Sequence, residues 1–231
     1  MSLTRIDHIK IDVPDLAAGV DTYHRLGFDM HVVGAKAIAR NQDDFLELKP
    51  GAGAGISAIA LRSDSLAADQ KAVTARGAIP FVVLSDSLQP RNPVPAMHPN
   101  GVYKLERVYV AVADLAAAVK EWRRVLDLAE PKMERGTVIM ADMAVFDLGP
   151  AGLTLAHPYG PGPTADALKN RGPGPFQVLY RTKSMDAAAK WIADHGIPPP
   201  ARGVRNTGEH AMLVRPEHAC GAFVGFVGPA L

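Results

Sequence analysis

The 231-residue chain contains a single cysteine, Cys220, which excludes an intrachain disulfide and a cysteine-based metal cluster. It also lacks a surplus of charge of either sign, because 25 Lys and Arg stand against 24 Asp and Glu, a formal net charge of +1. No block of like charges occurs along the chain. Nothing in the charge therefore favours nucleic acid or an anionic membrane as a partner.

Long apolar stretches are missing as well. No run of about 18 apolar residues free of charge is present, so a transmembrane helix is not expected. Residues 1–8 show no basic segment followed by an apolar stretch, as a secretion signal would. With the single cysteine, these features predict a cytoplasmic protein. The hydrophobic share of 48% and the length allow one large or two small globular domains.

An internal repeat organises the chain. Residues 6–18 recur as residues 105–117, and both segments alternate apolar and polar residues before ending in Asp-Leu-Ala-Ala. A second pair consists of residues 57–68 and 176–187, which share a strand-like pattern and a serine. A shared pattern over a strand, a helix start and a helix end is hard to obtain by chance.

The repeat predicts four modules that open near residues 5, 56, 105 and 175, each with a strand followed by a helix. Helix starts are predicted at residues that accept hydrogen bonds from free N–H groups, namely Asp15, Ser65, Asp114 and Ser184. Glycines predict three helix ends, at Gly27, Gly77 and Gly196, and Asp127 stands near the fourth. Later strands are expected at residues 37–40, 45–48, 138–141, 153–156, 212–214 and 222–227.

Loops rich in Gly and Pro are expected at residues 50–55, 89–101, 158–175 and 198–203. The loop at residues 89–101 is the best boundary between two halves, residues 1–101 and 102–231. The second module is irregular, because prolines interrupt the segment in which its last strands must lie.

Alternation assigns side chains to the two faces of each strand. In the first strand the apolar face carries Ile9, Ile11 and Val13, so His8 lies on the opposite face. In the strand at residues 45–48, Glu47 lies opposite the apolar residues. His8 and Glu47 share one concavity if the two strands are neighbours, which periodicity alone does not show.

Residues 7–9 followed by Val-Pro-Asp-Leu at 13–16 resemble the first strand and helix cap of the vicinal oxygen chelate superfamily. This group includes glyoxalase I, extradiol dioxygenases, epimerases and bleomycin-resistance proteins. Residues 39–48, 60–66 and 215–223 look like later segments of its glyoxalase-like branch. The resemblance covers the chain except residues 81–104. It implies an α+β fold of repeated βαβββ modules, paired into two cup-like open barrels.

The resemblance also implies a site. In this family a His of the first strand and a Glu of the last strand bind a divalent metal, which here corresponds to His8 and Glu47. The ion would be Zn, Ni, Mn or Fe and would polarise neighbouring oxygens of a small-molecule substrate. Homodimers are common in the superfamily, so a homodimer stays open.

The sequence departs from the family pattern at several ligand positions. Ala58, Arg107 and Gln177 stand where the other modules would carry His, and Thr154 stands where the third would carry Glu. Catalytic metal sites usually have about three protein ligands, and His98 is the candidate for the third. Candidate substrate-binding residues are Arg40, Asn41 and Arg107, because Arg grips carboxylates and phosphates.

Two functions follow. The first is a metal-dependent lyase, isomerase or ring-cleavage dioxygenase, in which Glu47 is a metal ligand or the catalytic base. The second is a metal-free protein of the bleomycin-resistance kind that binds a small molecule without turnover. The retained His8 and Glu47 favour the first function, and the missing ligands elsewhere favour the second.

Overall fold

The computed structural model describes residues 3–86, 98–205 and 207–229. Contacts divide the chain into two compact units. Unit 1 comprises residues 1–7, 58–89 and 107–176, and unit 2 comprises residues 8–57, 90–106 and 177–231. Each unit takes residues from both sides of position 101. The division into residues 1–101 and 102–231 therefore stays a prediction drawn from the sequence repeat.

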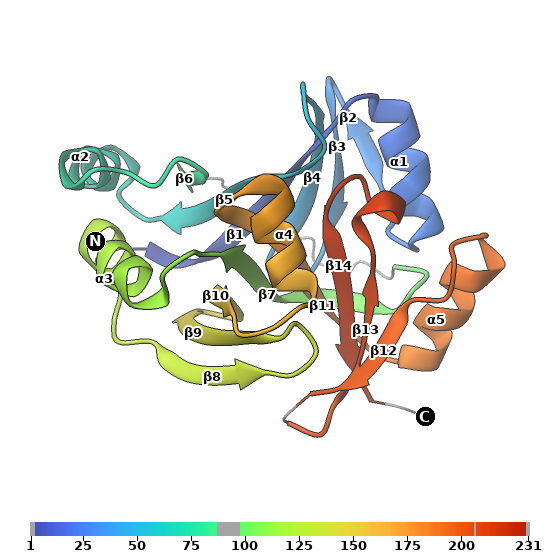
Figure 1. Cartoon of the computed structure of the whole chain (residues 1–231). Coiled ribbons are helices and arrows are strands. Elements are labelled where there is room, and N and C mark those ends of the chain that lie inside the picture. Colours follow the sequence, from blue (N-terminus) through green and yellow to red (C-terminus); the bar gives the residue numbers. More distant parts are fainter. Residues whose placement is uncertain (1–2, 87–97, 206, 230–231) are drawn as a thin grey trace. The chain divides into compact units, whose positions relative to one another are not determined.

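The described residues alternate strands and helices as a repeated βαβββ pattern requires (Figure 1). The strands are β1 (Leu3–Val13), β2 (His31–Val33), β3 (Lys36–Arg40), β4 (Phe45–Pro50), β5 (Gly55–Ser63), β6 (Val82–Ser85), β7 (Val102–Ala111), β8 (Lys132–Gly136), β9 (Ala141–Leu148), β10 (Ala151–Pro158), β11 (Gly174–Thr182), β12 (Ala201–Val204), β13 (His210–Val214) and β14 (Phe223–Gly228). The helices are α1 (Leu16–Arg25), α2 (Leu66–Arg76), α3 (Leu115–Leu126), α4 (Pro163–Arg171) and α5 (Met185–Asp194), with a short 3₁₀ turn at Pro216–His218.

Unit 2 contains the strands of the first and fourth modules. Their orders are β2-β3-β4-β1 and β12-β13-β14-β11, with β1 parallel to β4 and β11 parallel to β14. The helices α1 and α5 make the crossovers that parallel pairs require. Aromatic side chains fill the core of this unit, where Phe28 contacts the rings of Tyr23, Tyr180 and Phe226.

Unit 1 contains the third module and most of the second. Its larger set of strands runs in the order β7-β10-β9-β8, and β5 pairs with β6 in parallel. Helix α3 packs on β9 and β10 through the buried side chains Trp122, Val125 and Leu126. Each fully buried residue of this size contributes roughly 1.5–3 kcal/mol.

The predicted helix boundaries are confirmed. Asp15, Asp114 and Ser184 accept hydrogen bonds from backbone N–H groups three residues later, whereas Ser65 precedes α2 without a side-chain cap. Gly27, Gly77 and Gly196 follow their helices with positive φ angles of 88°, 107° and 73°. Asp127 takes the same left-handed conformation at the end of α3, with φ 57°.

Three local predictions are wrong. Residues 138–141 are mostly a turn, in which Met140 has φ 53°, and β9 begins only at Ala141. Helix α4 lies inside the stretch predicted as a loop, because Gly-Pro-Gly-Pro flanks both of its ends and dominates the composition. Strand β12 lies in the loop predicted at residues 198–203. The last strand expected in the second module falls largely on residues 87–97, outside the described residues.

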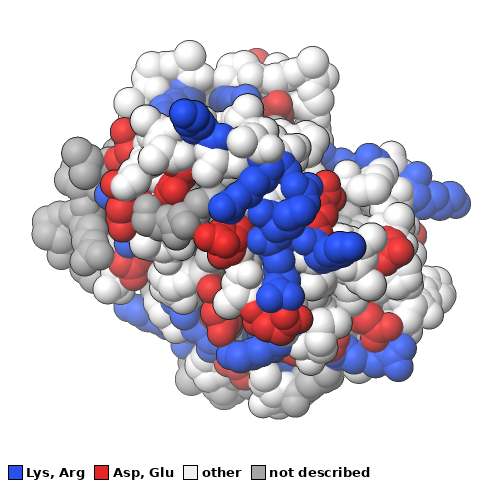
Figure 2. All heavy atoms as spheres, turned by 90° about the vertical axis from the view of Figure 1, so that its left-hand side faces the viewer, with Lys and Arg blue, Asp and Glu red and all other residues white. Residues whose placement is uncertain are grey.

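Among the described helices, none combines the length and apolar character needed to cross a bilayer. On the face drawn in Figure 2, Lys and Arg side chains gather in a central band, and Asp and Glu side chains border it. Basic and acidic groups are thus intermixed on this face, in keeping with the formal charge of +1.

Candidate functional site

The first candidate site is the face of β1, β3 and β4 that α1 leaves uncovered. Val13 lies against Gly19 of α1, so the helix covers the side of β1 that carries Ile9, Ile11 and Val13. His8, Lys10 and Asp12 therefore point to the opposite side. Strand β4 lies beside β1 with His8 level with Phe45 and Lys10 level with Glu47. Strands β1 and β4 are therefore neighbours, which is the condition for His8 and Glu47 to share one face.

Glu47 is the buried charge of this face, with only 5% of its surface exposed. Its Oε2 lies 2.7 Å from Nζ of Lys36 on β3, close enough for a charge-assisted hydrogen bond. Lys10 stands directly opposite Glu47 in the strand register. Within the described residues Lys10 has no ion-pair partner, so its ammonium is available to another group.

Asp12 and Lys49, two further charged residues of the face, lie close to each other. Asp12 accepts a hydrogen bond of 2.6 Å from the Ser57 hydroxyl, and Lys49 lies 3.5 Å from the same carboxylate. His8 is 6% exposed and stacks on the Phe45 ring, with 4.2 Å between ring centroids. The site thus places a buried imidazole–phenyl stack beside a carboxylate and several ammonium groups.

His98 lies in a hydrogen-bonded chain in the interior of unit 2. Its Nδ1 accepts from the backbone N–H of Asp29 at 3.0 Å, so the ring proton is assigned to Nε2, which lies 3.1 Å from Oδ1 of Asn41. The Asn41 amide donates to Asp44, and Asp44 accepts from the backbone N–H of Leu105. Burial lowers the pKa of His98 to about 4. The ring is therefore neutral near pH 7, and both of its nitrogens are occupied.

The structure places the predicted residues in two groups. The Asn41 amide contacts His98 and Asp44 in the interior. Arg40 lies level with Phe45 across the β3–β4 pair, on the face of Glu47. His8, Arg40 and Glu47 therefore come together, whereas Asn41 and His98 form a separate buried chain.

A divalent metal does not fit the residues present. His8 and Glu47 share a face, but each ring nitrogen of His98 already has a hydrogen-bond partner in a separate buried chain, and the Lys36 ammonium lies against Glu47. Among residues 3–86, 98–205 and 207–229, no three His, Cys, Asp or Glu side chains gather as a metal would need. A catalytic ion with about three protein ligands is therefore not supported by this donor set.

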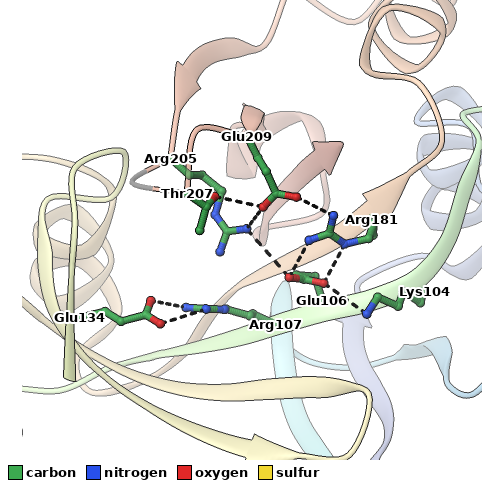
Figure 3. Close-up of polar contacts among 8 residues, drawn as sticks. All are labelled: Lys104, Glu106, Arg107, Glu134, Arg181, Arg205, Thr207 and Glu209. Carbon is green, nitrogen blue, oxygen red and sulfur yellow. Dashed lines mark hydrogen bonds and ion pairs between the residues drawn. The ribbon is translucent and has the colours of Figure 1, made fainter. Parts of the chain in front are cut away.

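In the third module, Arg107 occupies the position of the family's His. Its guanidinium makes a two-armed contact with Glu134 of β8, with N–O distances of 2.8 and 3.3 Å (Figure 3). The side chain crosses Gly152 of β10, where an added Cβ would lie 3.3 Å from Arg107 Cγ. Thr154, at the family's Glu position, is fully buried, and its hydroxyl has no hydrogen-bond partner in the described structure.

A further polar cluster lies in unit 2 and was not foreseen. Arg181 of β11 makes a two-armed contact with Glu106 and also donates to Glu209 (Figure 3). Glu209 accepts from Arg205 and from Thr207 as well. Glu106 and Arg107 are adjacent in sequence but have different partners, since Arg107 pairs with Glu134 and Glu106 pairs with Arg181.

Residues 106–214 match the family model described as the Glyoxalase/Bleomycin resistance protein/Dioxygenase superfamily. Among solved structures, a mutant of 4-hydroxymandelate synthase from Streptomyces coelicolor is similar over 97% of this chain and 92% of its own, with 14% identity and a TM-score of 0.71. Methylmalonyl-CoA epimerase from Mycobacterium tuberculosis is similar over 57% of this chain and 91% of its own, with 24% identity and a TM-score of 0.51. No curated protein matches the chain.

The repeated modules and these similarities define a protein with the vicinal oxygen chelate fold. The family model covers residues 106–214 of the chain, and this match agrees with the resemblance drawn from the sequence. The predicted fold class is confirmed. Because function in such a fold depends on the site and not on the architecture, the activity has to be argued from the side chains.

Proposed function

We propose that the protein binds a small anionic molecule on the face of β1, β3 and β4 without a resident metal. The observation that carries this proposal is the pair of lysines around Glu47. Lys36 neutralises the buried carboxylate at 2.7 Å. Lys10, level with the same carboxylate, has no ion-pair partner among the described residues.

Charge on this face supports an anion as the ligand. Lys36 pairs with Glu47 and Lys49 pairs with Asp12, whereas Lys10 has no ion-pair partner among the described residues. An oxyanion 4 Å from Lys10 would gain about 1 kcal/mol in a water-like environment and about 4 kcal/mol near a protein surface. A carboxylate or phosphate group meets this requirement.

The apolar part of the same face supports a ligand with a flat body. The stacked rings of His8 and Phe45 have an interplanar angle of 14°, and Ile38 is level with Glu47 on β3. Pockets for small molecules combine such apolar surface with a few charged groups that set orientation. We therefore expect aromatic carboxylates to bind more tightly than acetate.

A metal-dependent lyase, isomerase or dioxygenase is the second candidate. The observation in its favour is that His8 and Glu47 lie on one face of neighbouring strands. In that case Glu47 would be a ligand or the residue that accepts a proton from the substrate. This function requires a third protein ligand that the described residues do not bring to the face.

Two measurements separate these candidates. Metal analysis of protein purified without added metal or chelator, followed by titration with Zn, Ni, Mn and Fe ions, tests the second. A saturable ion that is lost in His8→Ala and Glu47→Ala would establish a metal site and contradict our proposal. Isothermal titration with benzoate and acetate tests the first.

The matched variants for the titration are Lys10→Gln and Lys49→Gln. Both remove one lysine from the same face, but Lys49 is paired with Asp12 at 3.5 Å. We expect Lys10→Gln to weaken benzoate binding about tenfold, the equivalent of about 1.4 kcal/mol, and Lys49→Gln to change it less than threefold. Equal losses in both variants, or no binding by the wild type, would refute the proposal.

A further inference from the structure

A network of five charged side chains joins β7, β11 and the β12–β13 hairpin in unit 2. Glu106 accepts two hydrogen bonds from Arg181 and lies 3.5 Å from Lys104 and 3.9 Å from Arg205. Glu209 accepts from Arg181 at 2.6 Å and from Arg205 at 3.0 Å. Arg181 therefore bridges both carboxylates, and Arg205 lies between them (Figure 3).

The two arginines of this network share its two carboxylates. Arg181 and Arg205 each lie within ion-pair distance of Glu106 and of Glu209. The side chains of Arg205 and Glu106 are only 13% and 16% exposed. A guanidinium that is mostly removed from water is stabilised when its remaining donors find an acceptor.

The carboxylates are ionised and already occupied. Burial acts to raise the pKa of Glu106, but hydrogen bonds and charge from Arg181, followed by Lys104 and Arg205, hold it below its usual value. Hydrogen bonding by Arg181 lowers the pKa of Glu209 against the effect of burial. Both groups therefore stay charged near neutral pH and remain ion-pair partners of Arg181 and Arg205.

Arg205 is the cation with donors to spare. It donates from Nη1 to Glu209, and within the described residues its Nε and Nη2 groups make no hydrogen bond. Figure 3 shows a second terminal nitrogen of Arg205 pointing away from both carboxylates. A guanidinium edge of this kind binds two oxygens of a carboxylate or phosphate at once. Arg181, by contrast, donates hydrogen bonds from Nε and both terminal nitrogens to Glu106 and Glu209.

We propose that the free edge of Arg205, held in place by Glu209 and Glu106, binds a small oxyanion, either a carboxylate or a phosphate group. The site is separate from the face around Lys10 and involves none of its residues. The β12–β13 hairpin supplies Arg205, so an anion bound there also ties the hairpin to the network.

The test uses the full chain with inorganic phosphate and acetate as probes, each titrated at constant ionic strength with chloride as the balancing salt. We expect saturable binding by the wild type of at least one probe and a tenfold or greater loss in Arg205→Gln. Arg205→Lys keeps the charge but not the two-armed edge, so it should restore part of the affinity. The stronger probe identifies the ligand as a carboxylate or a phosphate.

Arg202→Gln is the matched control. Arg202 lies on the same hairpin but is 62% exposed and 3.7 Å from Asp186, outside the network. Phosphate and acetate binding should be unchanged in Arg202→Gln and lost in Arg205→Gln, with circular dichroism showing that both variants are folded. Wild-type affinity in Arg205→Gln, or no binding of either probe by the wild type, would overturn the site. Loss in Lys10→Gln with retention in Arg205→Gln would assign anion binding to the first face alone.

Discussion

Acid should destabilise this protein through His98, which lies at the centre of a buried hydrogen-bonded chain. Burial lowers the pKa of His98 from 6.5 to about 4 in the folded state, and the unfolded chain keeps the ordinary value. Between these two values the unfolded chain binds a proton that the folded chain does not. Stability contributed by the neutral ring is therefore complete above pH 6.5 and is lost as the pH falls toward 4.

The size of this loss follows from the two pKa values. At about 1.4 kcal/mol per pH unit, the full difference corresponds to roughly 3 kcal/mol. At pH 4.5 about three quarters of it should be expressed, about 2.5 kcal/mol relative to pH 7.5. Protonation would also place a hydrogen on Nδ1, where the Asp29 N–H now donates. Loss of this hydrogen bond is part of the same free-energy cost of protonation.

Urea unfolding at pH 7.5 and pH 4.5 measures the effect, with His98→Asn as the variant that keeps an acceptor near Nδ1 but cannot titrate. His98→Asn should be less stable than wild type at pH 7.5, because the hydrogen bond to Asn41 is lost, and should lose about 2.5 kcal/mol less on acidification. His210→Asn, an exposed histidine, controls for loss of a titrating ring. An equal acid loss in wild type and His98→Asn would refute the reasoning.

Further predictions concern buried groups and a tight turn. Tyr180→Phe should be neutral or stabilising by up to about 1 kcal/mol, because the Tyr180 hydroxyl is buried without a hydrogen-bond partner in the described structure. Urea unfolding measures this change. The comparison is Tyr23→Phe, which removes a hydrogen bond to the Ala219 carbonyl and should cost about 1 kcal/mol. Gly27→Ala should lower the free energy of unfolding by more than about 2 kcal/mol, because φ is 88° and the new Cβ would lie 2.6 Å from Asn100 Cβ. Gly34→Ala, at φ 62° with open space around it, should cost about 1 kcal/mol or less; equal costs in the two variants would contradict this account.

Much of the fold could be predicted because it depends on short-range patterns. Alternation in the first strand separates Ile9 and Ile11 from His8, and the structure buries the first two beneath α1 as expected. Helix starts at Asp15 and Asp114 follow from a local hydrogen bond that the residue type itself provides. Repetition of these signals along the chain then indicates the fold class.

Helix α4 shows where local signals fail. Its nine residues lie between two Gly-Pro-Gly-Pro segments, and Gly and Pro usually indicate turns. Proline is nevertheless favourable at the first position of a helix, where Pro163 stands, because its missing N–H would have no partner there. Burial of Thr164 and Ala167 then stabilises a helix that composition alone argues against.

The chemistry of the site was harder to predict, because it depends on pairs of residues that lie far apart in sequence. The spacing of the repeat indicates that Glu47 faces outward from the helix, but not that Lys36 reaches it. In the same way, Arg107 is visible as a replacement for His, while its partner Glu134 lies 27 positions later on a strand that was not predicted.

The ion pairs Lys36–Glu47 and Arg107–Glu134 have a common physical basis. In the first module Lys36 lies against the carboxylate that a family metal would use, and in the third Arg107 stands at the position of the family's His and binds Glu134. A positive side chain can offset the charge of a buried carboxylate as an ion would, but it does not leave open positions for substrate oxygens. Our two proposals therefore assign anion binding to cations that are not used in such pairs, namely Lys10 and the free edge of Arg205.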